Sequence, residues 1–302
     1  MSIIVQNITK LYGEQKALNN ISFEIKTGEV VGFLGPNGAG KSTMMKILTG
    51  YIPQTEGKAS VFGFDINDQS DDVKRSVGYL PESNPLYYDM YIKEYLEFIG
   101  GIYGIKNKAA RVKEMVEMTG LGPEQHKKIG QLSKGYKQRV GLAQAIIHDP
   151  KVLILDEPTS GLDPNQLADI RQLIVNLGKE KTVMLSTHIM QEVEAICGRV
   201  IIINQGIMAA DDNMADLRKN KINTHAFYVE FDKAIQGDKL KRIEGVLRVA
   251  PAGTNAFNIE ANANKDIRAE LFQFAVKEGL ALLTVKKLEQ NLEDVFRSLT
   301  KK

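Results

Sequence analysis

Cysteine, long apolar runs and excess charge are all scarce in this sequence, and each scarcity excludes a class of protein. Cys197 is the only cysteine among 302 residues, which excludes an intramolecular disulfide framework and a multi-cysteine metal site. Lys and Arg number 39 against 37 Asp and Glu, a net charge of +2, so we expect no nucleic-acid partner. No run reaches the roughly 18 apolar residues that cross a bilayer. Residues 1–16 also lack the pattern of a secretory signal.

Up to about residue 220, short apolar runs alternate with helical stretches, the pattern of an α/β domain. Several runs are continuously apolar, which predicts strands buried on both faces of a mainly parallel sheet. Residues 3–11 and 21–25 alternate more, which predicts an antiparallel N-terminal β layer. The predicted strands are 29–34, 76–80, 151–155, 182–186 and 200–204, and the predicted helices are 41–49, 92–103, 108–119, 135–148, 164–179 and 190–197.

The polar run 218–224 predicts a linker, after which the order of elements changes. Residues 223–302 predict strand, helix, two strands, helix and strand, followed by a last helix at 288–299. This order is typical of a small ferredoxin-like α+β sandwich. We therefore predict two domains: an α/β domain at 1–220, with a helical subdomain at about 83–150, and an accessory or dimerisation domain at 223–302.

One segment fits the phosphate-binding pattern G-x-x-x-x-G-K-[ST]. Its glycines let the backbone turn tightly, so that successive N–H groups and the start of the next helix point at the phosphates. The lysine reaches the β- and γ-phosphates, and the following hydroxyl can bind Mg²⁺. A predicted strand precedes the segment and a predicted helix follows it, so we expect ATP binding with Mg²⁺. The segment comprises Gly35, Pro36, Asn37, Gly38, Ala39, Gly40, Lys41, Ser42 and Thr43.

A second part of the predicted site follows the apolar strand 152–155. Asp156 ends this strand, where an unpaired buried carboxylate would be costly. A Mg²⁺ ion shared with the phosphates would offset that cost. Glu157 comes next and is predicted to polarise the water that attacks the γ-phosphate.

Lys41 and Asp156 are 115 residues apart, which leaves room for an inserted helical segment. In that segment, Leu132-Ser-Lys-Gly-Tyr136 matches the signature LSGGQ except at Lys134 and Tyr136. Ser160-Gly-Leu-Asp163 and Ser186-Thr-His188 follow in order, and Tyr12 lies near the N-terminus. With these motifs, residues 1 to about 215 resemble the ATP-binding subunits of ABC transporters, which implies the cassette form of the P-loop NTPase fold.

The resemblance implies roles for further residues. In the family, two cassettes dimerise head to tail, so that each ATP lies between one chain's phosphate loop and the other chain's signature. Ser133 and Gly135 would then contact ATP in trans, in a homodimer or with a homologous cassette. The remaining family roles fall on His188 at the γ-phosphate, Tyr12 at the adenine and Asp163 in the D-loop.

One residue departs from the family pattern. The family usually has a glutamine after the strand at 76–80, where it links Mg²⁺ and the attacking water to the membrane partner. Glu82 stands at this place. A glutamate can approach Mg²⁺, but it donates no hydrogen bond when ionised. We predict the catalytic and metal role for Glu82 nonetheless.

Glutamate at this position is frequent in the branch that pairs with ABC-2 type permeases. The segment 79–87 and the signature also resemble the ATP-binding subunit associated with bacterial gliding motility. The resemblance implies a motor on the cytoplasmic face of the inner membrane that drives a separate permease. The aromatic-rich stretch 83–103 is either helix core or a groove for a permease helix.

Other functions remain less favoured. A non-transport ABC ATPase doing mechanical or regulatory work is the main alternative. DNA-repair members insert long coiled coils or zinc modules, which the 115-residue gap and the single cysteine argue against. Translation-associated members usually carry two cassettes, whereas one is present here. The guanine-specifying NKxD pattern is absent, which argues against a GTPase.

Overall fold

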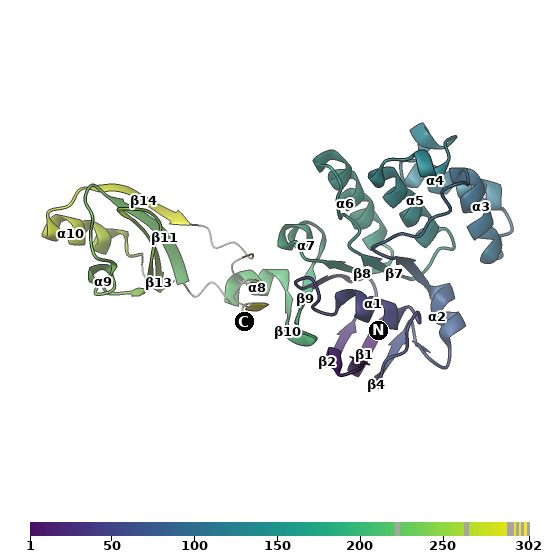
Figure 1. The fold of residues 1–302 in the computed structure, drawn as a ribbon, viewed down its shortest axis with the longest axis horizontal. Helices are drawn as coiled ribbons and strands as arrows, with labels where there is room; N and C mark the ends of the chain where they lie inside the picture. Colours follow the sequence, from purple (N-terminus) through teal and green to yellow (C-terminus); the bar gives the residue numbers. More distant parts are fainter. Residues whose placement is uncertain (221–223, 263–265, 289–292, 294–295, 297–298, 301–302) are drawn as a thin grey trace. The chain divides into compact units, whose positions relative to one another are not determined.

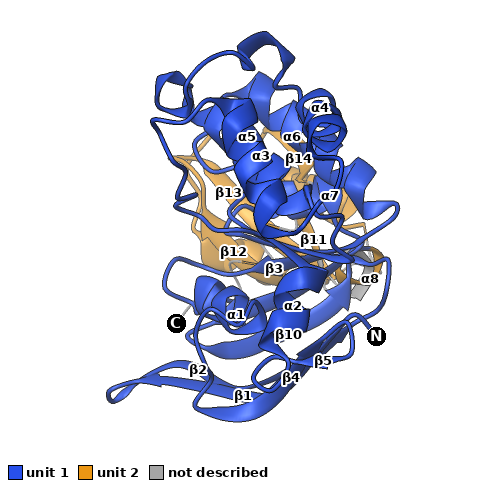
Figure 2. Cartoon of the chain, turned by 90° about the vertical axis from the view of Figure 1, so that its right-hand side faces the viewer, with its two compact units in different colours: residues 1–214, 299–302 blue, residues 215–298 orange. Residues whose placement is uncertain are grey.

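The computed structural model describes residues 1–220, 224–262, 266–288, 293, 296 and 299–300. The chain divides into two compact units (Figures 1 and 2). Unit 1 comprises residues 1–214 and 299–302, and unit 2 comprises residues 215–298. Among the described residues, no helix is long and apolar enough to span a membrane.

Unit 1 contains a four-stranded antiparallel sheet, which confirms the predicted N-terminal β layer. Its order is β2 (Gln15–Ile25), β1 (Ile3–Tyr12), β4 (Glu56–Val61) and β5 (Phe64–Asp65). The apolar residues of the sequence explain the layer, because Ile3, Val5 and Ile8 are buried while Gln6 and Asn7 face solvent. The strands β4 and β5 were not predicted.

The second sheet of unit 1 has six strands. Five run parallel, as the continuously apolar runs predicted, and β10 pairs antiparallel with β9 at one edge. Every residue of β7 is buried, as expected for a strand covered on both faces. The order is β10 (Ile207–Asn213), β9 (Arg199–Asn204), β3 (Val30–Leu34), β8 (Thr182–Thr187), β7 (Val152–Asp156) and β6 (Val77–Leu80).

Helices cover both faces of the six-stranded sheet (Figure 1). Helix α1 (Lys41–Leu48) lies between the two sheets, and its buried Met44, Met45 and Ile47 join both to one core. Helices α6 (Pro164–Gly178) and α7 (Met190–Ile196) pack on the opposite face. The helical subdomain comprises α3 (Ile92–Ile102), α4 (Lys108–Met118) and α5 (Lys134–Ile146), while α2 (Ser70–Ser76) precedes β6.

Unit 2 is a four-stranded antiparallel sheet in the order β12 (Val246–Pro251), β13 (Ala256–Asn262), β11 (Thr224–Phe231) and β14 (Leu282–Leu288). With α9 (Gly237–Leu240) and α10 (Arg268–Glu278) in between, this is the predicted ferredoxin-like order. Its own core includes Phe227, Phe231 and Leu271. The two units therefore have separate hydrophobic cores.

Two local predictions need comment. The predicted linker 218–224 is wrong in part, because α8 (Met214–Asn220) covers its first half and β11 begins at Thr224. Met214 and Leu217 are buried, and this burial stabilises a helix whose polar end resembles a linker in the sequence. The predicted last helix, 288–299, lies largely outside the described residues.

Candidate functional site

The segment 35–40 forms a loop between the end of β3 and the start of α1. Gly40 has a φ of 107°, and a Cβ there would lie 2.5 Å from the Ala17 carbonyl oxygen. A Cβ at Gly35 would collide with the Ile203 carbonyl oxygen. Only glycine fits at these two positions. Close packing against β2 and β9 thus fixes the loop, and the N-terminus of α1 follows it directly.

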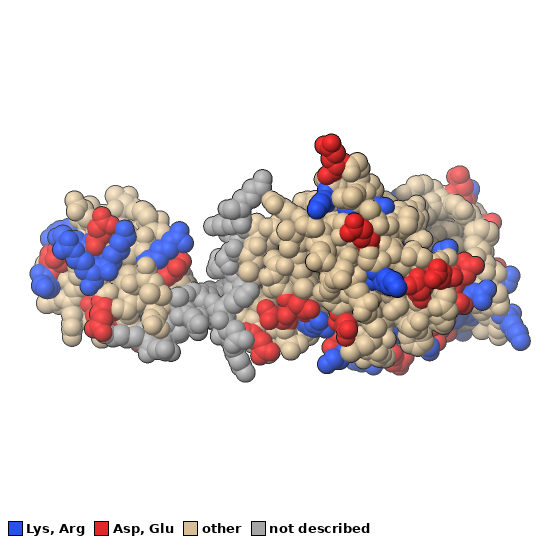
Figure 3. All heavy atoms as spheres, turned by 90° about the horizontal axis from the view of Figure 1, so that it is seen from below, with Lys and Arg blue, Asp and Glu red and all other residues tan. Residues whose placement is uncertain are grey.

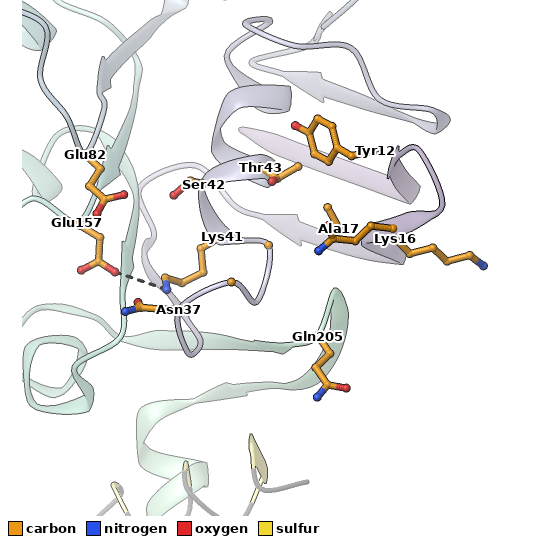
Figure 4. Close-up of a pocket in the computed structure, with 13 residues that line it drawn as sticks. Tyr12, Lys16, Ala17, Asn37, Lys41, Ser42, Thr43, Glu82, Glu157 and Gln205 are labelled. Atoms are coloured by element: carbon orange, nitrogen blue, oxygen red, sulfur yellow. Dashed lines mark ion pairs between the residues drawn. The ribbon is translucent and has the colours of Figure 1, made fainter.

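Lys41 is buried at the start of α1, beneath this loop. Its Nζ donates hydrogen bonds to the carbonyl oxygens of Gly35 at 2.8 Å and Pro36 at 3.3 Å. It also lies 3.6 Å from Glu157 Oε1 (Figure 4). The loop and the acidic strand are therefore joined through one ammonium group.

Asp156 and Glu157 lie at the carboxyl end of β7, where the neighbouring β8 supplies Ser186. The Ser186 hydroxyl donates to Asp156 Oδ1, and the Glu157 N–H donates to Ser186 Oγ at 3.1 Å. Glu157 has a φ of 49°, a strained left-handed conformation for a non-glycine residue. This turn directs the Glu157 side chain at the loop, while Asp156 stays buried in the strand. The sequence does not predict these hydrogen bonds of Ser186 with Asp156 and Glu157.

His188 follows β8 and contacts Glu157. Its Nδ1–H donates to both carboxylate oxygens of Glu157 at 3.0 Å. The β8 end also holds the loop, because the Gly35 N–H donates to the Thr187 carbonyl oxygen at 3.3 Å. The structure thus brings together the predicted residues Lys41, Glu157 and His188.

A cavity of about 610 Å³ contains most of the predicted nucleotide site (Figure 4). Glu157 and Glu82 lie at one end of it, and Tyr12 lies at the other with half of its surface exposed. Four residues that the sequence motifs missed, Gln15, Lys16, Ala17 and Gln205, line it too. From the predicted set, the lining includes Tyr12, Asn37, Gly38, Gly40, Lys41, Ser42, Thr43, Glu82 and Glu157.

The signature residues and Asp163 do not line this cavity. Ser133 is the N-cap of α5, where its Oγ accepts from the Tyr136 N–H at 3.4 Å. Asp163 is the N-cap of α6, where its Oδ1 accepts from the N–H groups of Asn165 at 3.1 Å and Gln166 at 2.9 Å. Both residues are solvent-exposed.

The signature and the D-loop pack against each other within the chain. A Cβ at Gly135 would collide with the Gln166 amide, and a Cβ at Gly161 would collide with Lys134 Nζ. Lys134, which stands at the third position of the signature, therefore lies across the D-loop.

A second cavity, of about 550 Å³, lies between the six-stranded sheet and the helical subdomain. Its ionisable lining residues are Lys46, Lys74 and His148, together with tyrosines. His148 stacks on Tyr103, with ring centroids 3.9 Å apart, and its Nε2–H donates to the Val77 carbonyl oxygen at 3.1 Å. Burial lowers the pKa of His148 to about 4, so this histidine is neutral at physiological pH.

The glycine loop, the lysine at the start of α1 and the acidic end of β7 define a P-loop nucleoside triphosphatase. The family model described as "ABC transporter" matches residues 18–160. The chain is 33% identical over 304 residues to the bacitracin transport ATP-binding protein BcrA of Bacillus licheniformis, covering 99% of this chain and 98% of that protein. It is also 33% identical to the linearmycin resistance ATP-binding protein LnrL of Bacillus subtilis, covering 98% and 97%. The chain belongs to the ATP-binding subunits of ABC transporters.

Solved structures agree with this family. The dimeric structure of the bacterial ABC transporter cassette MJ0796 matches with a TM-score of 0.65 at 30% identity, covering 70% of this chain and 98% of that one. A dimeric post-hydrolysis state of the same cassette, bound to ADP and Pi, also matches with a TM-score of 0.65, at 29% identity. The chain therefore has the ABC cassette fold, and it is an ATPase that binds ATP.

Proposed function

We propose that this chain is the ATP-driven motor subunit of an ABC-2 type transporter, with a separate permease in the membrane. The observation that carries the proposal is the cavity in which Lys41 and Glu157 meet, with Tyr12 at its opposite end. In this assignment, the loop 35–40 and Lys41 hold the β- and γ-phosphates, Thr43 lies beside them, and adenine stacks on Tyr12.

The residues at the phosphate end fit a magnesium ion. Asp156 is a buried carboxylate with one oxygen held by Ser186, and Ser42 and Glu82 also offer oxygen. Among the described residues, no cluster of three or more His, Cys, Asp or Glu side chains could hold a metal. Phosphate oxygens and water molecules must therefore complete the coordination shell of the magnesium ion, as is usual for Mg²⁺. Mg²⁺ would neutralise charge on the phosphates.

Glu157 is the proposed general base. Its carboxylate is oriented by His188 and faces Lys41, so it can accept a proton from a water at the γ-phosphate. His188 is more exposed than Glu157 and is proposed to contact the γ-phosphate itself. Glu82 enters the same end of the cavity from the turn after β6.

Two chains are proposed to complete each ATP site. Ser133 and Gly135 stand at the start of α5 and outside their own chain's nucleotide cavity. A second chain docked head to tail would bring its Ser133, Gly135 and Asp163 to this cavity, and the positive end of its α5 to the γ-phosphate. The dimeric cassettes among the structural relatives support this arrangement. We propose a homodimer or a pair with a homologous cassette.

The second cavity is the proposed docking groove for a cytoplasmic helix of the permease. Tyr51, Tyr79 and Tyr103 line it. Elsewhere in the stretch 83–103, Tyr87, Tyr88 and Phe98 are each more than 40% exposed. Such side chains are common anchors in protein interfaces. On the face shown in Figure 3, basic and acidic residues are interspersed, so this face offers no docking surface of a single charge. We propose that the chain works on the cytoplasmic face of the membrane.

The relatives favour an export function. One is named for bacitracin transport and another for linearmycin resistance, so we propose that the permease exports an amphiphilic antibiotic-like compound. The association with gliding motility stays a prediction from the sequence, and mechanical work without transport is the alternative output.

Purification from detergent-solubilised membranes tests the proposal. The tagged chain should retain an ABC-2 type permease, which mass spectrometry would identify. Tyr103→Ala together with Lys74→Glu should reduce this retention, whereas Lys58→Glu, which changes an exposed lysine on β4, should not. Retention of no membrane protein, or of an unrelated one, would contradict the transporter assignment. Loss of gliding without loss of drug resistance in a deletion strain would favour the motility assignment.

A further inference from the structure

The tight turn between β9 and β10 presents one side chain to the nucleotide cavity that no sequence motif identifies. Asn204 pairs with Ile207 across the two antiparallel strands, so Gln205 and Gly206 form a two-residue hairpin turn. Gln205 lines the cavity, and Figure 4 shows it on the far side of Ala17 from Tyr12. It therefore stands away from the proposed adenine position.

This turn is fixed to the site by its backbone. The Gly206 N–H donates to the Ala39 carbonyl oxygen at 3.0 Å, and the Gly206 carbonyl oxygen accepts from the Asn19 N–H at 2.8 Å. Gln205 itself has a φ of 50°, a left-handed conformation that glycine adopts without strain. Positive φ at both Gln205 and Gly206 is what a type I′ hairpin turn requires, so the pairing of the two strands fixes the place of the Gln205 side chain at the cavity.

The chemistry of the position suits a sugar. The turn contacts Ala39 of the phosphate loop and lies beside Ala17 on β2, while Tyr12 lies on the other side of Ala17. An amide donates and accepts hydrogen bonds, as a hydroxyl does. The Gln205 side-chain amide makes no hydrogen bond to any of the described residues. The carboxylates of Glu82 and Glu157 lie at the other end of the cavity.

We infer that Gln205 hydrogen-bonds a ribose hydroxyl of ATP and makes the cassette prefer ribonucleotides to deoxyribonucleotides. This inference rests on the proposed placement of the phosphates at Lys41 and of adenine at Tyr12. It adds a specificity residue to the site.

Gln205→Gly is the test variant, because it removes the amide and relieves the left-handed strain. Its melting temperature should equal or exceed that of the unchanged chain, so a loss of binding cannot be ascribed to misfolding. Gln15→Ala is the matched control, since Gln15 is another exposed amide on the same cavity but lies on the β1–β2 hairpin near Tyr12.

Calorimetric titration with ATP, 2′-deoxy-ATP and 3′-deoxy-ATP measures the preference, in a Glu157→Gln background that prevents turnover. The chain with Gln205 should bind ATP about 5-fold more tightly than at least one deoxy analogue, the value of one hydrogen bond. Gln205→Gly should bind ATP more weakly and abolish this difference, while Gln15→Ala should keep it.

Two results would overturn the inference. One is equal binding of ATP and both analogues by the chain with Gln205, or an unchanged preference in Gln205→Gly. The other is an equal weakening of all three nucleotides in Gln205→Gly, which would assign the amide to a phosphate. Failure of the inference about Gln205 can be distinguished from failure of the proposed ATP site. In the second case, the Lys41→Ala chain would bind ATP as tightly as the unchanged chain.

Discussion

Lys41 Nζ lies 3.6 Å from Glu157 Oε1, and both side chains are almost fully buried. The same ammonium donates to two carbonyl oxygens of the phosphate loop, and the same carboxylate accepts from His188. The proposed phosphate ligand and the proposed general base are therefore partners before ATP arrives. ATP binding must exchange the contact between Lys41 and Glu157 for contacts of each with phosphate and water.

Glu157→Gln should trap ATP in a stable dimer. The amide keeps the size of the side chain but cannot act as a general base, so turnover should fall by about 100-fold or more. Light scattering in saturating ATP should show a dimer, and a phosphate-release assay should show almost no product. Glu180→Gln, an exposed glutamate after α6, should behave as the unchanged chain. A Glu157→Gln monomer in saturating ATP would contradict the head-to-tail model.

Ser133→Asp should separate ATP binding from dimer formation. Aspartate keeps the N-cap of α5, so thermal stability should be retained, while Ser133→Ala should lose about 1 kcal/mol. The new carboxylate would repel the partner's ATP, so ATP should bind without dimerisation. Mixed with Lys41→Ala, the variant should form at most one working site per dimer. Two working sites in this mixture would exclude completion in trans.

Tyr12→Ala should weaken ATP binding by about 10-fold, the value of one lost base-stacking contact. Tyr12→Phe should keep the affinity, because the ring and not the hydroxyl makes the contact. Tyr51→Ala removes an exposed tyrosine that lies outside the nucleotide cavity and is the control. The affinity for inorganic triphosphate, which has no base, should be the same in all four chains. Unchanged ATP affinity in Tyr12→Ala would place adenine elsewhere.

His148 should make the stability of unit 1 depend on pH. Burial lowers the pKa of His148 from 6.5 to about 4, so between these values the unfolded chain binds the proton and the folded chain does not. The contribution of His148 to the free energy of unfolding is therefore complete above pH 6.5. It decreases as the pH drops toward 4, by at most about 3 kcal/mol. His148→Phe keeps the stacking on Tyr103. The urea midpoint of this variant should therefore change less between pH 7 and pH 5 than that of the unchanged chain. If the midpoint of this variant changed as much with pH as that of the unchanged chain, His148 would not be the cause of the pH dependence.

The phosphate site could be predicted because its determinants are local in the sequence. The segment 35–43 contains the turn, the cation and the hydroxyls, and the apolar run before Asp156 identifies the neighbouring buried strand. Gln205 could not be predicted, because its place in the cavity depends on the pairing of β9 with β3. In the sequence, Ser186 is only part of the motif that ends at His188, and its contact with Asp156 depends on the pairing of β7 with β8.

The boundary between the two units shows a second limit of prediction from the sequence. The polar composition of 218–224 predicts a linker, yet the helix that overlaps it is held by Met214 and Leu217. A polar face alone does not distinguish a linker from a surface helix. The ferredoxin-like order of unit 2 was predictable because its strands alternate inward and outward residues, as Phe227, Val229 and Phe231 do in β11.

The contact between Lys134 and Gly161 joins the two segments that face a partner chain in the proposed dimer. Displacement of the D-loop in one chain would move the ammonium at the start of α5, and with it the signature of that same chain. In the proposed dimer, Gly161 follows Glu157 of its own chain's ATP site by four residues, while Ser133 and Asp163 of the same chain approach the partner's ATP. We therefore expect the two ATP sites to be hydrolysed with kinetic cooperativity, and shortening Lys134 to alanine to reduce the Hill coefficient of the ATPase toward one.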